Sequence, residues 1–194
     1  MKTLVYLMMC CGLALAGARS LRGQELDRVG AIVVDPLAPA ERDNWKKVSG
    51  VWDFDKGVLT GSGSSRIDYT RQFLAPVRIT FDLEVIDGVR PRGYFGRYTL
   101  AHEGFNGRLF GVYPSQGRLK KYRYEAGRKY PVKIEIEKQR MEVRIDAKIV
   151  DSRDVGMEAL PSLGLSSGDD YSQGMSRFSN MRIEGVPSAA TTGH

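Results

Sequence analysis

The fold is decided by the stretch Arg78-Ile-Thr-Phe-Asp-Leu-Glu-Val85, in which polar and apolar residues alternate without a break. Successive side chains of a β-strand point to opposite faces, so this pattern puts four apolar side chains, from Ile79 to Val85, on one face. A strand with one apolar and one polar face is typical of an antiparallel sheet that covers a core on one side. The stretch therefore predicts an antiparallel β protein.

The same alternation occurs in two further segments, Val132–Ile136 and Met141–Ile145, on either side of the Glu137–Arg140 turn. Together these segments predict a hairpin with one buried and one solvated face. The alternation predicts an interior that includes Trp52, Phe81, Leu83, Ile134, Ile136, Val143 and Ile145.

Weaker strand patterns fill the rest of the chain, with turn residues between them. They cover residues 31–34, 50–54, 58–60, 94–100, 109–113, 119–124, 163–165 and 176–183. The short Pro39–Arg42 segment is the only helix candidate. Gly61–Ser65 is interpreted as a turn and not as a phosphate-binding loop, because no helix pattern follows it. About a dozen short strands of this kind predict an all-β fold, a two-sheet antiparallel jelly-roll sandwich.

The N-terminus has the pattern of a secretory signal peptide. Lys2 precedes an apolar run that ends in Ala16-Gly17-Ala18, a small-x-small cleavage site. The run is shorter than the roughly 20 residues that a membrane span needs. We therefore expect a signal peptide over residues 1–18, cleaved after Ala18 or Ser20. The sequence predicts a secreted or periplasmic bacterial protein that does not span the membrane.

Domain boundaries follow from composition. Residues 19–28 are expected to form a linker, residues 29–185 the β-sandwich, and residues 186–194, which are small and polar, a disordered tail. Cys10 and Cys11 both lie in the signal, so the exported chain would carry no cysteine. The formal net charge of +6 falls to +5 when the signal is removed. This mild basicity does not indicate a nucleic-acid partner.

Metal and cofactor chemistry has little basis in the sequence. His102 is the only histidine outside the predicted tail, and a transition-metal site needs more imidazole or thiolate ligands than that. Asp169 and Asp170 are weak candidate calcium ligands, and an exposed turn is the favoured explanation. No cofactor is expected.

A family resemblance rests on two parts of the chain. The segment from Asn44 to Gly61 resembles the opening of secreted bacterial jelly rolls, a tryptophan strand followed by a Gly-x-Trp-x-x-x-x-Gly-x-Leu motif. Tyr130 to Val150 is similar to their hairpin, with Ala147 where glycine is usual. Leu163-Gly-Leu165 and Phe178-Ser-Asn-Met-Arg-Ile183 resemble their closing strands.

In these motifs the chain resembles the concanavalin A-like lectin/glucanase superfamily. Within it, the chain is most similar to the 3-keto-disaccharide hydrolase domain, also called domain of unknown function 1080. The resemblance implies a concanavalin A-like sandwich that handles carbohydrate, and it brings cleavage of 3-keto-disaccharides as a possible activity. In the middle third the family's Asn-Ser-Gly-Ile-x-x-Arg pattern is replaced by Arg92-Gly-Tyr-Phe-Gly-Arg97, in which only Arg97 matches.

Catalytic candidates are few. Glycoside hydrolysis usually needs two carboxylates, and Asp82 and Glu84 lie two apart on one predicted strand face. A solvated strand face explains the same spacing. His102, beside Glu103, is a candidate general acid or base, and an ordinary surface histidine is the alternative. The Glu-x-Asp-x-(x)-Glu motif of the superfamily's glucanases is absent.

Sugar binding has a stronger basis, because sugar rings stack on aromatic side chains while polar groups bind their hydroxyls. The middle third combines tyrosines with arginines, a histidine and a carboxylate. The predicted binding residues are Tyr94, Arg97, Tyr98, His102, Glu103 and Tyr124. About half of the tyrosines there are expected to pack in the core instead.

A basic stretch from Lys120 to Lys129 would attract an anionic polysaccharide, although a soluble hairpin with charged edges is the favoured explanation. The sequence as a whole predicts an exported carbohydrate-binding or carbohydrate-processing domain, with a glycan or disaccharide as its partner. The alternatives are a 3-keto-glycoside hydrolase and a non-catalytic interaction module of the cell envelope.

Overall fold

The computed structural model describes residues 30–88, 91–103, 109–114, 122–156, 159–160, 162–168 and 173–188. The predicted signal peptide and linker lie outside these residues, as do Lys120, Lys121 and the Asp169-Asp170 pair. One short 3-10 helix, η1 (Pro39–Asn44), covers the predicted Pro39–Arg42 segment. No helix among the described residues has the length and apolar character that a membrane crossing needs.

All other elements are strands, and every pairing between them is antiparallel. They are β1 (Ile32–Val34), β2 (Trp45–Asp55), β3 (Val58–Tyr69), β4 (Phe73–Gly88), β5 (Arg92–Phe95), β6 (Tyr98–Glu103), β7 (Leu109–Tyr113), β8 (Tyr122–Arg123), β9 (Lys129–Glu137), β10 (Arg140–Ile145), β11 (Lys148–Asp154), β12 (Ala159–Leu160), β13 (Leu163–Ser166) and β14 (Gly174–Pro187).

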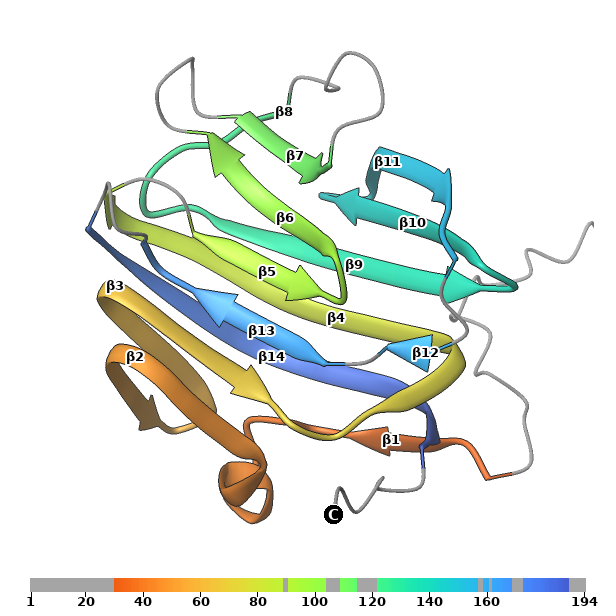
Figure 1. The fold of residues 1–194 in the computed structure, drawn as a ribbon. Coiled ribbons are helices and arrows are strands. Elements are labelled where there is room, and N and C mark those ends of the chain that lie inside the picture. Colours follow the sequence, from red (N-terminus) through yellow and green to blue (C-terminus); the bar gives the residue numbers. More distant parts are fainter. Residues whose placement is uncertain are drawn as a thin grey trace, which may run out of the picture.

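The strands form two layers joined by β3. The hydrogen-bonded path runs β11-β10-β9-β4-β14-β3-β13-β5-β6-β7-β8. Residues 58–62 of β3 pair with β14, whereas residues 66–69 pair with β13. We call the β11-β10-β9-β4-β14 layer the first sheet and the β13-β5-β6-β7-β8 layer the second sheet; Figure 1 shows both. The predicted two-sheet sandwich is confirmed.

The core lies between the two sheets. Phe81, Leu83, Ile134 and their alternating neighbours are buried as the sequence pattern predicts. Trp45 is also buried, and Trp52 is partly buried against the core. The predicted interior residues that are fully buried are Phe81, Leu83, Ile134, Ile136, Val143 and Ile145.

The segment Gly61–Ser65 lies inside β3, which corrects its interpretation as a turn. Here β3 crosses from one sheet to the other, and β2 pairs with β3 on both sides of the crossing. Small residues are required because the ring of Trp52 lies over Gly61, where a Cβ atom would be 2.6 Å from the ring carbon Cζ3. Gly63 adopts a positive φ of 74°, a conformation that glycine accepts readily.

Residues 94–100 form parts of two strands and not the single predicted strand. A two-residue turn at Gly96 and Arg97 separates β5 from β6, with Gly96 at a φ of 61°. A two-residue loop with glycine at its first position is a common connection between the strands of a β-hairpin. The turn pairs Phe95 with Tyr98 and Tyr94 with Thr99. Tyr94 and Tyr98 therefore lie on opposite faces of the sheet.

The start of the predicted disordered tail is ordered. Strand β14 extends to Pro187, and Val186 and Pro187 pair with β4. The backbone N–H of Ser188 donates to the carbonyl oxygen of Gln72 at 2.9 Å. These ladder contacts satisfy backbone groups that a free tail would leave to water. The remainder of the tail lies outside the described residues.

A buried arginine connects the first sheet with the second sheet. The Arg153 side chain of β11 is only 2% exposed, and its Nε lies 2.5 Å from Asp151 Oδ2. The same guanidinium donates to the carbonyl oxygens of Val112, in β7, and Pro114. Because β11 and β7 belong to different sheets, these contacts hold the open side of the sandwich together.

Candidate functional site

The outer face of the second sheet carries two rows of side chains that cross several strands. One row consists of Lys46, Asp68, Gly164, Tyr94 and Thr99, which follow one another in the strand register. The next row consists of Ser49, Arg66, Ser166 and Arg92. Residues paired in register lie side by side on the same face of a sheet. The rows bring together residues that are far apart in the sequence.

Gly164 makes room in the middle of the first row. A Cβ atom there would lie 2.5 Å from Asp68 Oδ1 and 3.2 Å from Tyr94 Cβ. Both distances are shorter than ordinary van der Waals contact. The absence of a side chain at Gly164 therefore lets Tyr94 and Asp68 approach each other across β13.

An arginine holds this pair in place. The Arg66 guanidinium carbon lies 4.5 Å from the centre of the Tyr94 ring, within range of a cation–π interaction. Its Nε and Nη2 donate to the two carboxylate oxygens of Asp68 at 3.0 and 3.3 Å. The two-point contact fixes the plane of the guanidinium, and with it the position of Arg66 beside the tyrosine.

A groove of about 230 Å³ lies next to Tyr94. We call it the Tyr94 groove; it is lined by Ser49, Ser64, Ser65, Arg66, Arg92, Tyr94, Ser166 and Gly168. Ser166 is buried, and its hydroxyl donates to the Gly168 carbonyl. The lining thus offers an aromatic ring, two guanidinium groups and several hydroxyls. Such a combination suits a ligand that carries many hydroxyl groups.

The outer face of the first sheet has a different character, because most of its charges are paired. Glu135 lies 2.7 Å from Arg78 and 2.8 Å from Lys133, measured between side-chain oxygen and nitrogen. Arg78 also lies 3.1 Å from Glu184, which in turn contacts Arg182 at 2.7 Å. This continuous network spans β4, β9 and β14.

The network sets the titration of Glu135. Burial favours the neutral carboxyl and would raise its pKa, but hydrogen bonds and charges from Lys133 and Arg78 outweigh burial. The pKa of Glu135 is therefore lowered below the usual glutamate value. A carboxylate held ionised in this way is poorly suited to donate a proton as a general acid.

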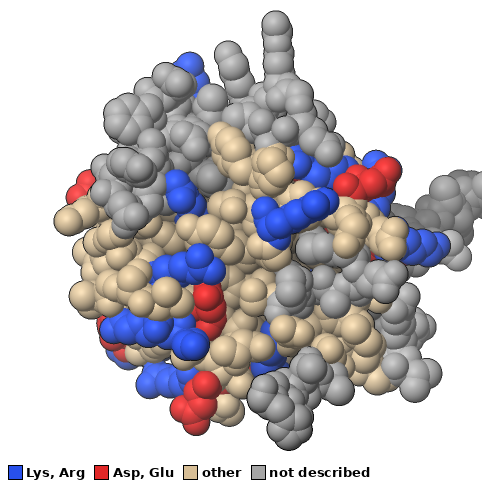
Figure 2. Space-filling view, in the orientation of Figure 1, with Lys and Arg blue, Asp and Glu red and all other residues tan. Residues whose placement is uncertain are grey.

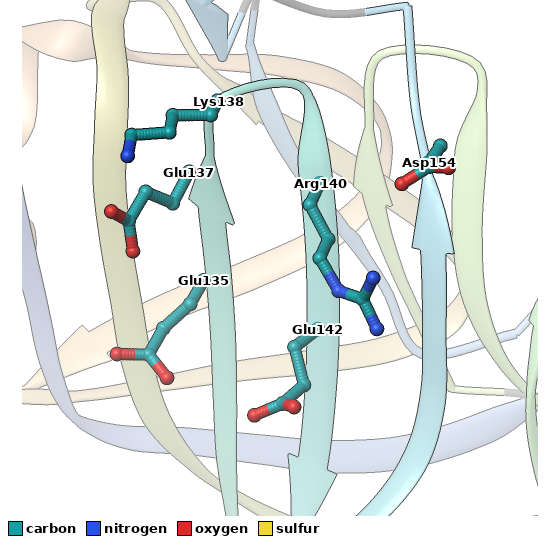
Figure 3. Close-up of a pocket in the computed structure, with 6 residues that line it drawn as sticks. All are labelled: Glu135, Glu137, Lys138, Arg140, Glu142 and Asp154. Atoms are coloured by element: carbon teal, nitrogen blue, oxygen red, sulfur yellow. The ribbon is translucent and has the colours of Figure 1, made fainter.

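A hollow of about 440 Å³ lies at the edge of this face, and Figure 3 shows the side chains that line it. It is lined by Glu135, Glu137, Lys138, Arg140, Glu142 and Asp154. Glu135 and Glu142 extend from the paired strands β9 and β10, where they are register partners. Glu142 binds Arg144 at 2.5 Å and raises the pKa of that guanidinium. The lining includes no aromatic residue on which a sugar ring could stack.

Asp82 and Glu84 also lie on the outer face of the first sheet, half-buried and on one side of β4 as expected. Asn180 Nδ2 donates to Asp82 Oδ2 at 2.6 Å. Glu84 Oε2 lies 3.8 Å from Arg177 Nη1. The two carboxylates are thus separated from the Tyr94 groove by the thickness of the sandwich. Their catalytic role remains a prediction.

Two of the predicted sugar-stacking rings belong to the core. Tyr98 is 3% exposed and Tyr124 is 4% exposed, and both lie in the buried hydrophobic cluster. Tyr98 packs against Phe95, and Tyr124 packs against Phe110. A ring enclosed by other side chains has no open face for a sugar, which corrects the expectation for these two tyrosines. Tyr94 is the predicted ring that lies on the outer face.

Arg97 lies in the turn between β5 and β6, where its Nη2 donates to the Tyr98 hydroxyl at 2.9 Å. This contact directs Arg97 toward the buried tyrosine. His102 and Glu103 end β6, and their side chains lie outside the described part of the structure. Asp169 and Asp170 lie outside it as well. The described residues contain no group of three or more side chains suited to hold a metal ion.

Of the described residues that line the Tyr94 groove, only Tyr94 was predicted as a binding residue; Arg66, Arg92 and Ser166 were not. The space that Gly164 leaves beside Tyr94 was not predicted either. The alternation in Arg66-Ile-Asp-Tyr69 and Leu163-Gly-Leu-Ser166 does place the polar or small residues on one face. Alternation within a strand does not reveal which strands are neighbours. The pairing of β13 between β3 and β5 was therefore the missing information.

Comparison with known proteins supports the fold. The sequence matches no family model and no curated protein. Among solved structures, a glycosyl hydrolase-like protein from Parabacteroides distasonis has a TM-score of 0.57 at 14% identity, covering 74% of this chain and 94% of its own. A glycosidic hydrolase has a TM-score of 0.55 at 9% identity, covering 80% of this chain and 96% of its own.

The carbohydrate recognition domain of Emp47p has a TM-score of 0.51 at 10% identity, covering 74% of this chain and 89% of its own. Identities this low show a shared fold and nothing finer. The chain therefore has the jelly-roll sandwich architecture found in these proteins, as the concanavalin A-like resemblance of its sequence implies.

Proposed function

We propose that this protein is an exported glycan-binding domain whose ligand lies in the Tyr94 groove. The observation that carries the proposal is the half-exposed Tyr94 ring beside two arginines and a row of serines. Aromatic rings contact the apolar face of a sugar, while guanidinium and hydroxyl groups bind its hydroxyls. The signal-like N-terminus supports export.

The similar folds are consistent with this function, since they include a carbohydrate recognition domain and proteins named as glycosidic hydrolases. Binding is favoured over cleavage by the composition of the groove. Hydrolysis of a glycoside usually needs two carboxylates flanking the scissile bond. The described lining of the Tyr94 groove contains none, and the nearby Asp68 is held by Arg66.

Cleavage of 3-keto-disaccharides is the second candidate, and it rests on the sequence resemblance together with Asp82 and Glu84. Turnover of a 3-keto-disaccharide by the purified protein would establish it. Loss of that turnover in Asp82→Asn or Glu84→Gln would identify these carboxylates as catalytic. The third alternative, an interaction module without any sugar ligand, would give neither turnover nor glycan binding.

A glycan array tests the binding function directly. The wild-type protein should retain one or more glycans, and Tyr94→Ala should weaken the best of them by about fivefold or more through lost ring contact. Tyr94→Phe is the matched control, because it keeps the ring and removes only the hydroxyl. Equal binding by folded Tyr94→Ala and wild type, or no glycan binding at all, would reject the proposal.

A further inference from the structure

We infer that the ligand of the Tyr94 groove is an anionic sugar, a uronate, a sialylated sugar or a sulfated sugar, whose acidic group binds at Arg92 and Arg66. This inference rests on the proposed glycan-binding function and adds the charge class of the ligand. It is carried by the distribution of charge across the two rows of outward side chains.

Basic residues outnumber acidic residues in the two rows. Of the described residues in the two rows, Lys46, Arg66 and Arg92 are cationic and Asp68 is the single acidic one. Asp68 binds only one edge of the Arg66 guanidinium, through Nε and Nη2. Arginine has five N–H donors, so Arg66 keeps further donors for a second acceptor. The rows therefore combine net positive charge with donor capacity.

The geometry of the groove suits a carboxylate or a sulfate beside a sugar ring. Arg66 and Arg92 both pair with Ser166, one on each side, so that their backbones flank the same short strand, β13. Planar guanidinium groups bind carboxylate and sulfate-type oxygens with paired hydrogen bonds. Tyr94 lies two residues from Arg92 on the same strand face, next to the space in which a sugar ring would lie.

The outer face of the first sheet differs from the Tyr94 groove. This difference argues that the basic groove is a specific feature and not a consequence of the protein's overall positive charge. Its outward arginines face nearby glutamates: Arg78 contacts Glu135 and Glu184, and Arg182 contacts Glu184. Figure 2 shows the side of the molecule on which the second sheet lies in front; among its coloured side chains, those of Lys and Arg cover more of the surface than those of Asp and Glu. An excess of cations in one groove attracts an anion more strongly than evenly paired charges do.

The test compares acidic glycans with neutralised forms of the same glycans. Uronate oligosaccharides are printed beside their methyl esters, sialylated glycans beside their methyl esters, and sulfated glycans beside desulfated ones. We expect each retained acidic glycan to bind about tenfold or more tightly than its neutral form, because a charge-assisted contact is lost. Raising NaCl from 50 to 300 mM should weaken the acidic form more than the neutral form.

Titration calorimetry with the best acidic glycan then assigns the residues. Arg92→Gln should weaken binding about tenfold or more and reduce the preference for the acidic form. Arg182→Gln, the same change on the opposite face, should leave binding unchanged. Thermal unfolding of each variant verifies its fold, and the acid-to-ester comparison in the wild-type protein does not depend on any variant.

The outcomes separate the two proposals. Equal affinity for acidic and neutral forms, combined with loss of binding in Tyr94→Ala, would overturn the anionic ligand and leave the glycan site standing. Unchanged acid preference in folded Arg92→Gln would also overturn it. Glycan binding that does not depend on Tyr94, or none, would reject the proposed function itself.

Discussion

Ala147 adopts a backbone conformation that usually belongs to glycine. Its φ is 61°, and it lies in the two-residue turn between β10 and β11, with Asp146 at 49°. A non-glycine residue in this left-handed region costs roughly 1–2 kcal/mol. Replacement by glycine recovers only part of this cost, because glycine makes the unfolded chain more flexible. The conformation is imposed by the short hairpin connection.

Ala147→Gly should therefore raise the free energy of unfolding by about 0.5–1 kcal/mol. Urea denaturation measures the change. Ala126→Gly is the control, because Ala126 is also exposed but is not among the residues with positive φ. A variant Ala147→Gly that is no more stable than wild type would contradict the strain at this turn.

The residue-level predictions from sequence succeed where alternation is long and unbroken. Phe81 and Ile134 lie in the core as predicted. Each belongs to a regular strand in which the polar residues next to it in the sequence point to the other face. The single strand that the sequence predicts for residues 94–100 would put Tyr94 and Tyr98 on one face, because side chains four residues apart in a strand point the same way. Gly96 reverses the chain between them, and a turn of two residues is enough to separate a surface ring from a core ring.

At the scale of elements, β2 and β3 form the joint between the two sheets, and Gly50 is the tightest point of that joint. Gly50 has a φ of 70°, and a Cβ atom there would lie 2.4 Å from Ser65 Cβ and 2.5 Å from Ser65 Cα. The second distance is to a backbone atom, which cannot move without shifting β3. Two strands therefore cross closely here, and only glycine fits.

Gly50→Ala should destabilise the protein by more than the roughly 1–2 kcal/mol that the left-handed backbone alone costs. Gly57→Ala is the matched control: its φ is 76°, but a Cβ atom there meets nothing within 4 Å. Chemical denaturation measures the loss of unfolding free energy in both variants. The loss in Gly57→Ala reports the backbone cost alone, and the additional loss in Gly50→Ala reports the steric clash with Ser65. Equal losses in the two variants would argue against a close crossing at Gly50.

The sequence indicated most elements but not how they combine. The predicted β9–β10 hairpin and its turn are present, because neighbouring strands in sequence pair by the shortest connection. The central position of β13 between β3 and β5 joins segments about 70–100 residues apart, and no local pattern specifies such a pairing. The Tyr94 groove depends on that pairing.

At the scale of the whole molecule, the ion-pair network on the first sheet links stability to pH. The pKa of Glu135 is lowered in the folded protein, whereas an unfolded glutamate titrates near 4.3. The stabilisation is therefore complete above pH of about 4.3 and is lost as the pH falls through the lower folded-state pKa. Acid should weaken the contacts of Glu135 with Arg78 and Lys133.

Glu135→Gln should lower the free energy of unfolding at pH 7 and flatten its dependence on pH below about pH 5. Denaturation curves collected from pH 7 to pH 3 measure both effects. The difference between wild type and variant should shrink toward the acid end, where the wild-type carboxyl becomes protonated. A difference that stays constant over this range would show that Glu135 is not held ionised by its neighbours.

The central claim is that the outer face of the second sheet binds glycan, and nuclear magnetic resonance tests it most directly. Amide ¹H–¹⁵N shifts are followed while the best glycan from the array is added to the folded protein. We predict changes concentrated at residues 66–68, 92–94 and 164–166, which the strand register places side by side. Changes confined to residues 78–84 and 133–144 of the first sheet would contradict the claim.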